Sequence, residues 1–192
     1  MRQEVEIEFK NLLTQQEYEG LKARFFTENS VPVTQENYYF DTKDFSLKKA
    51  SCALRIRIKE DDAEMTLKTP FEGHHTETTV DMSTEEAREL SAEGSFSVPE
   101  AIVSVLKQED ILISQDVIKI GQLKTERLEV EKPHVIIVLD KSFYSDKVDY
   151  ELEIEADSKS AGEAFFFRLL EENAIPRRNT PNKIARAFNA AK

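Results

Sequence analysis

The sequence is poor in the residues on which several common chemistries depend. Its single cysteine, Cys52, cannot form an intramolecular disulfide, which is typical of a protein from a reducing compartment. Cys52 begins a strand-like run, where a small core residue is a better interpretation than a nucleophile. The five glycines are scattered, and neither G-x-x-x-x-G-K-[ST] nor G-x-G-x-x-G is present. The usual glycine-rich phosphate loops are therefore excluded.

Histidine is equally scarce, with His74, His75 and His134 only. Adjacent residues of a strand point to opposite faces, so His74 and His75 make a poor joint metal site. We expect surface or wall positions for these side chains. Zinc enzymes and Ser-His-Asp hydrolases are therefore weak candidates.

Positively charged residues are in the minority: the chain has 26 Lys and Arg and 37 Asp and Glu, for a net charge of −11. A broad nucleic-acid or anionic-membrane surface requires the opposite balance, although a local basic pocket remains compatible with it. The N-terminal run MRQEVEIEFK is charged throughout, and it predicts neither a signal peptide nor a membrane span. We expect a cytoplasmic protein with no nucleic-acid or membrane partner, and a single domain over residues 1–192.

Polar and apolar residues alternate with a period of two along most of the chain, which is typical of half-buried strands. This pattern predicts about eight strands, over residues 2–11, 33–41, 52–60, 64–69, 74–82, 117–131, 135–144 and 148–156. Short polar turns, such as 60–62 and 145–146, predict that neighbouring strands are antiparallel. Gly121 interrupts the sixth run, where we expect a bulge.

Helices are predicted at only a few places. Capping-box spacing marks three helix starts, at Thr14 with Glu17, Ser83 with Glu86, and Ser97 with Glu100. A longer amphipathic helix is predicted over 161–173, where Pro176 follows its end. A last short helix is predicted to begin at Thr180 or Pro181.

The polar faces of the predicted strands are charged and segregated by sign. Residues 4–10 and 149–155 place carboxylates on one face, whereas 55–59 places three cations on one face. For a single strand, a solvated outer face is the simpler interpretation. However, stacked carboxylates are unfavourable unless cations compensate them, and about eight strands suffice to close a barrel that holds one small ligand.

We therefore predict a mainly β (α+β) fold, an eight-stranded closed antiparallel β-barrel with a charged lumen and flanking amphipathic helices. An open sheet with a charged groove is the alternative. The carboxylates suit hard divalent cations, and the cations suit an anion with several oxygens, such as polyphosphate. The chemistry implied is metal-assisted phosphoryl transfer.

One segment, Glu6-Ile7-Glu8-Phe9-Lys10, resembles the ExExK signature of the CYTH superfamily, the triphosphate tunnel metalloenzymes. The resemblance extends through Arg55-Ile56-Arg57, Lys68, Arg127, the 151–155 strand and Asn182-Lys183. It implies an eight-stranded antiparallel tunnel, Mg²⁺ or Mn²⁺ as cofactor, and a small-molecule triphosphate substrate. Activities in the family include inorganic, thiamine and RNA triphosphatase and class IV adenylate cyclase.

The resemblance also implies roles for individual residues. The implied metal ligands are Glu6, Glu8, Glu151 and Glu153, and Glu153 with Glu155 is the alternative pair from the last strand. The implied phosphate-binding residues are Lys10, Arg55, Arg57, Lys68, Arg127 and Lys183. The implied catalytic residues are Glu6, Glu8 and Lys183. Glu4 and Glu155 share these faces as further ligands or tuning groups, and Asp41 and Asp140 are weaker candidates for which turn capping is at least as good an interpretation.

The preferred prediction is a metal-dependent triphosphatase that acts on inorganic triphosphate or a small organic triphosphate, as a monomer or homodimer. A class IV-type adenylate cyclase is the first alternative, although no residues dedicated to adenine are recognisable. A non-catalytic polyphosphate- or nucleotide-binding module is the second alternative.

Overall fold

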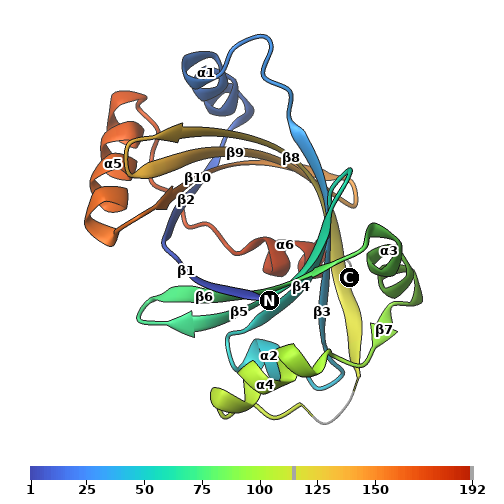
Figure 1. The fold of residues 1–192 in the computed structure, drawn as a ribbon. Coiled ribbons are helices and arrows are strands. Elements are labelled where there is room, and N and C mark those ends of the chain that lie inside the picture. Colours follow the sequence, from blue (N-terminus) through green and yellow to red (C-terminus); the bar gives the residue numbers. More distant parts are fainter. Residues whose placement is uncertain (114–115, 191–192) are drawn as a thin grey trace. The chain divides into compact units, whose positions relative to one another are not determined.

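The computed structural model describes residues 1–113 and 116–190 (Figure 1). It divides into two compact units. Unit 1 comprises Met1–Val5, Gln35–Leu123 and Lys183–Lys192, and unit 2 comprises Glu6–Thr34 and Lys124–Asn182. Each unit contains one part of the β-structure with its own hydrophobic core.

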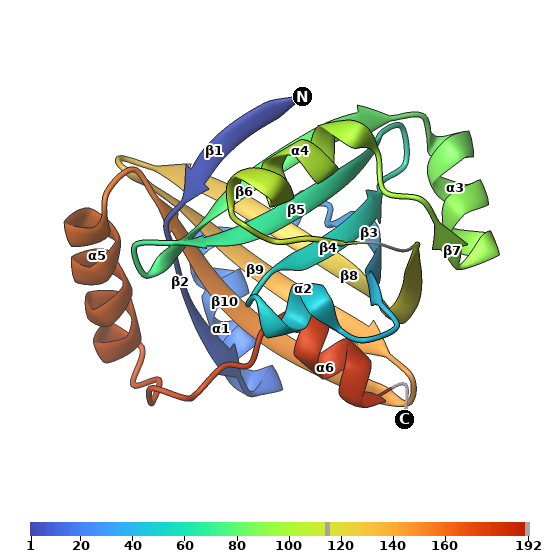
Figure 2. The same ribbon diagram turned by 90° about the horizontal axis from the view of Figure 1, so that it is seen from below.

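Unit 1 is built on a sheet in the order β1-β6-β5-β4-β3-β8, in which the neighbours from β6 to β3 are antiparallel. Its strands are β1 (Arg2–Glu6, all but its last residue), β3 (Val33–Thr42, from Gln35 on), β4 (Ala53–Ile58), β5 (Ala63–Phe71), β6 (His74–Met82) and the first part of β8 (Val117–Lys132). The two-residue strand β7 (Ser95–Phe96) pairs with the start of β8. Helices α2 (Ser46–Lys49), α3 (Thr84–Glu93) and α4 (Glu100–Gln108) cover one face of this sheet (Figure 2).

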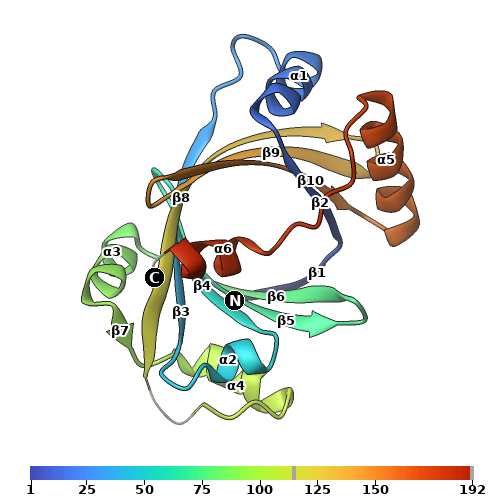
Figure 3. The ribbon, with the colours of Figure 1, turned by 180° about the vertical axis from the view of Figure 1, so that it is seen from behind.

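Unit 2 contains the second part of β8 followed by β9, β10 and β2, all antiparallel. These strands are β9 (Val135–Tyr144), β10 (Lys147–Ala156) and β2 (Glu8–Leu13). Helices α1 (Gln15–Phe25) and α5 (Lys159–Glu172) pack on the same face of the sheet, as Figure 3 shows. The prediction of a mainly antiparallel β fold with flanking helices is confirmed.

Each predicted strand corresponds to an observed one, with one division. The run 2–11 forms two strands, β1 and β2, which separate at Ile7. The turns 60–62 and 145–146 connect antiparallel neighbours as expected. The sequence pattern did not reveal β7 or α2, because two and four residues are too short to display a period.

The helix starts were predicted correctly at two of the three capping boxes. Thr14 and Glu17 form both reciprocal bonds of a capping box at α1, and the Ser83 hydroxyl accepts from the backbone of Glu86 at α3. The prediction for Ser97 is wrong, because α4 begins without a side-chain cap and the Ser97 hydroxyl bonds to Asp116 instead.

One further correction concerns the C-terminal helix α6 (Lys183–Ala190) of unit 1. It begins later than predicted, because the Thr180 hydroxyl accepts a hydrogen bond from the Leu12 amide at 2.9 Å and lies outside the helix. Gly121 lies within β8, where the bulge stays a prediction, and a Cβ atom there would meet the Ala187 carbonyl carbon at 3.1 Å. Because Gly121 has no side chain, α6 can pack close to the backbone of β8 at this position.

Both cores lie on the helix-covered faces of their sheets. In unit 1 the apolar residues of β4 and β5 pack against α2, α3 and α4, and Cys52 is buried among them. The prediction of a small core residue is therefore confirmed for Cys52, and burial raises the pKa of its thiol to about 11. No helix in the described part of the chain has the length and apolar character needed to cross a membrane.

Candidate functional site

The opposite face of the unit 1 sheet gathers three of the predicted phosphate-binding residues. Leu54 and Ile56 of β4 enter the core, so Arg55 and Arg57, which alternate with them, share the other face. Lys68 of β5 is on this face too, because the register places Arg55 opposite Thr66, two residues before Lys68. The register therefore places Arg55, Arg57 and Lys68 on a common face of the sheet.

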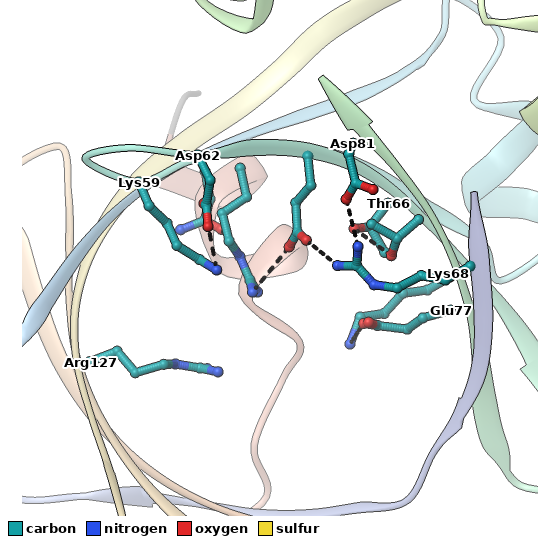
Figure 4. A network of polar contacts seen from close by, with 12 residues as sticks. Lys59, Asp62, Thr66, Lys68, Glu77, Asp81 and Arg127 are labelled. Atoms are coloured by element: carbon teal, nitrogen blue, oxygen red, sulfur yellow. Dashed lines mark hydrogen bonds and ion pairs between the residues drawn. The ribbon is translucent and has the colours of Figure 1, made fainter. Parts of the chain in front are cut away.

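The cations of unit 1 differ in their partners (Figure 4). The Lys68 ammonium pairs with Glu77 of β6 at 2.7 Å. The Arg57 guanidinium faces Glu64 at 3.4 Å and donates from Nε to the side-chain oxygen of Asn37. Arg55 is only 9% exposed, and its Nε has no hydrogen-bond partner within the described residues. A buried guanidinium with an unused donor is suited to an incoming anion.

Glu77 is ionised within this cluster of cations. Its burial raises the pKa, but the charges of Lys68, Arg55 and Arg57 and the hydrogen bond from Lys68 outweigh burial and lower it overall. Neither Glu77 nor Asn37 was predicted from the sequence to be a site residue. Their alternation along β6 and β3 was visible, but the cross-strand register that brings them to the cations was not.

In unit 2, the face of the sheet opposite the helix-covered core is acidic. Glu151, Glu153 and Glu155 alternate along β10 with Leu152 and Ile154, which belong to the core. Glu151 is 1% and Glu153 is 5% exposed. A solvated charged face, the simpler interpretation for one strand, is therefore excluded for Glu151 and Glu153.

Strand β2 adds to the acidic face from the edge of the unit 2 sheet. The register sets Lys10 opposite Glu153 and Glu8 opposite Glu155. The Lys10 ammonium lies 2.7 Å from the Glu8 carboxylate. Unit 2 thus brings together the predicted metal ligands Glu8, Glu151 and Glu153 on one face, with Lys10 among them.

Arg127 of β8 is the second cation of this face, and its guanidinium is directed at carboxylates. Its Nε and Nη2 donate to the two oxygens of Asp140 at 2.8 and 2.7 Å, and Nη2 also donates to Glu153 at 2.6 Å. Glu129 and Glu155 lie 3.5 and 3.6 Å from Nη1. Burial would lower the pKa of Arg127, but Asp140 and Glu153 raise it well above its usual value. Its predicted contact with phosphate stays a prediction.

The acidic face is crowded with like charge. Burial raises the pKa of Glu155 to about 7; Arg127 opposes this shift, whereas Glu153, Glu6 and Glu129 add to it. Repulsion between neighbouring carboxylates is relieved by a bound cation. Carboxylate oxygens are the preferred ligands of Mg²⁺ and Mn²⁺, so the residues of this face fit a divalent metal.

Three other candidates have clear positions. Asp41 accepts from the backbone amides of Thr42, Leu47 and Lys48, so it holds the start of α2, as the turn-capping interpretation predicts. Asp140 lies in the middle of β9, so the turn-capping interpretation is wrong for this residue. Lys183 is the half-buried first residue of α6.

The three histidines differ in exposure. His74 and His75 are half-buried neighbours on β6. The ring of His134 is 75% exposed and faces Asp157.

Glu4, on β1, is exposed to solvent, whereas Glu151 and Glu153 of β10 are buried.

Comparisons with known proteins give a consistent result. The family model described as "CYTH domain" matches residues 4–188. The Bacillus subtilis (strain 168) protein named "Putative triphosphatase YjbK" is 41% identical over 189 residues, which cover 98% of this chain and 96% of that protein.

Two solved structures have the same fold. A Bacillus halodurans protein described as a "putative adenylate cyclase" is 37% identical, with a TM-score of 0.86 and coverage of 98% of this chain and 100% of that one. A Hippeastrum protein, described as a "putative adenylyl cyclase" with dominant triphosphatase activity, is 22% identical, with a TM-score of 0.72 and coverage of 98% and 96%.

Proposed function

Since this chain belongs to the CYTH domain family, we propose that it hydrolyses a triphosphate group with the help of a divalent cation. The substrate is inorganic triphosphate or a small organic triphosphate. The observation that carries the proposal is the buried guanidinium of Arg55, whose Nε has no hydrogen-bond partner within the described residues and which shares its face with Arg57 and Lys68. The name of the B. subtilis relative supports the same activity.

The cations of unit 1 bind the phosphates in this proposal. Arg55 and Arg57 bind phosphate oxygens through their planar forks, and Lys68 adds a point charge. These three groups neutralise negative charge of a triphosphate and hold its chain in one orientation, which is the main requirement of phosphoryl transfer. Lys10 and Arg127, which belong to unit 2, are assigned to phosphate on the family resemblance of the sequence.

The carboxylates of unit 2 hold the metal in this proposal. Glu6, Glu8, Glu151 and Glu153 are the ligands, with Glu155 as the alternative to Glu151. Bound Mg²⁺ or Mn²⁺ supplies charge neutralisation and an oriented water molecule. Asp140 keeps Arg127 in place beside Glu153, so that the ligand face remains electrically balanced. Lys183, at the start of α6, contacts the phosphates or assists hydrolysis.

The domain organisation, cellular location and oligomeric state are part of the proposal. Residues 1–192 act as one domain, in the cytoplasm, as a monomer or homodimer. The substrate is a small molecule, because the contacts available to it address phosphates and the net charge of −11 disfavours nucleic acid.

An adenylate cyclase is the second candidate, because the B. halodurans relative has that description at 37% identity. Product analysis separates the two functions. We expect the protein, incubated with Mg²⁺ or Mn²⁺, to release orthophosphate from inorganic triphosphate, ATP or thiamine triphosphate. Cyclic AMP with pyrophosphate from ATP would establish the cyclase instead. If none of the three substrates is turned over while inorganic triphosphate still binds, the protein is a binding module and the proposed hydrolysis is wrong.

A further inference from the structure

The carboxylate of Glu77 lies among the cations of the unit 1 face. Its carboxylate is 2.7 Å from the Lys68 ammonium, and the two residues are directly opposite each other in the pairing of β5 with β6. Arg55 and Arg57 act on the same carboxylate electrostatically. The side chain of Glu77 is 15% exposed, so water screens these interactions only weakly.

A carboxylate and a phosphate present the same kind of oxygen to an ammonium or a guanidinium group. A phosphate that is to bind Lys68 therefore meets a cation already paired with a carboxylate. The second carboxylate of the cluster, Glu64, stands in the same relation to Arg57, but at 3.4 Å and with Arg2 at 2.7 Å as its closer partner. Glu77 is thus the carboxylate of this cluster that is most closely engaged with a predicted phosphate-binding cation.

We propose that Glu77 is an internal competitor for the phosphate-binding cations, which the phosphate chain displaces from Lys68 when it binds. This inference rests on the proposed function, because it assigns phosphates to Arg55, Arg57 and Lys68. Glu77 keeps the buried cations compensated before the substrate arrives. It also lowers the affinity of the site for anions, so that the products of hydrolysis leave readily.

The ordinary structural role of a cross-strand ion pair leads to a different expectation. If the pair only stabilises the sheet, its removal lowers the melting temperature and leaves anion affinity unchanged. If Glu77 competes with phosphate, its neutralisation strengthens anion binding, because like charge beside a bound anion opposes binding. Anion affinity therefore separates the two roles.

The test is calorimetric titration of wild type and Glu77→Gln with inorganic triphosphate and with pyrophosphate, at one ionic strength. We expect both dissociation constants to fall about tenfold in Glu77→Gln. Asp81→Asn is the matched control. It removes the same charge from the same face of β6, but Asp81 is exposed and pairs with Arg2, so we expect less than a twofold change.

Unchanged dissociation constants in Glu77→Gln would overturn the proposal, as would a loss of turnover at unchanged affinity, which would assign Glu77 to catalysis. If Glu77→Gln does not fold, Glu77→Asp tests the same point, since its shorter side chain retreats from Lys68, and affinities equal to wild type would overturn the proposal. Turnover by the wild type is measured separately. Its absence would refute the proposed hydrolysis, whereas the titrations would still decide the role of Glu77.

Discussion

Replacing Glu6 with glutamine is expected to lower the metal-dependent release of orthophosphate from inorganic triphosphate by at least about a hundredfold. Loss of a group that merely supports a metal ligand costs roughly 10- to 100-fold, and Glu6 is assigned as a ligand itself. An amide is a weaker ligand than a carboxylate for hard cations. The rate is measured at saturating Mg²⁺ and again at saturating Mn²⁺.

The fold of Glu6→Gln should remain intact. Glu6 is half-buried and its charge acts unfavourably on Glu155, so neutralising it removes repulsion. Glu4→Gln is the matched control, because Glu4 lies two residues earlier on β1 and is exposed; we expect its activity to stay within about twofold of wild type, as is usual for a surface substitution. Full activity in Glu6→Gln would show that the metal assignment is wrong.

Replacing Arg127 with methionine is expected to lower the free energy of unfolding by roughly 3–5 kcal/mol, the usual cost of removing one partner from a buried ion pair. The substitution leaves the fully buried Asp140 and the nearly buried Glu153 without their shared cation. For a chain of this size the loss corresponds to a fall of roughly 6–20 °C in melting temperature. Thermal unfolding without divalent metal measures it.

Arg168→Met is the control for the Arg127 experiment. Arg168 is 64% exposed and lies 3.9 Å from Glu172 on the surface of α5, and an exposed pair of this kind contributes about 0–1 kcal/mol. If Arg127→Met melts within about 2 °C of wild type, the guanidinium does not compensate the buried carboxylates and our account of the acidic face fails.

The strands were predictable because each has one apolar and one charged face. Along β10, Glu151, Glu153 and Glu155 alternate with core residues without interruption, so a period of two was sufficient to find the strand and its faces. The same period grouped Arg55 with Arg57. Sequence patterning was enough here because burial of one face dictates the alternation.

The partners of the charged residues were not predictable in the same way. Arg127 was assigned to phosphate with the other cations, but the register of β8 with β9 sets it opposite Asp140. The pair of Lys68 with Glu77 likewise depends on the register of β5 with β6. A one-residue shift would change every such pair, and a pattern of charges along one strand does not contain that information.

The most direct test of the account is the melting temperature of the wild-type protein with Mg²⁺ alone, inorganic triphosphate alone, and both together at matched ionic strength. A ligand at about 100 times its dissociation constant stabilises the folded state by about 2.7 kcal/mol, which corresponds to roughly 5–10 °C here. We predict a rise of this size with both ligands, and a smaller rise with either one alone. An unchanged melting temperature at saturating concentrations of both would contradict the assignment of these charged faces to metal and triphosphate.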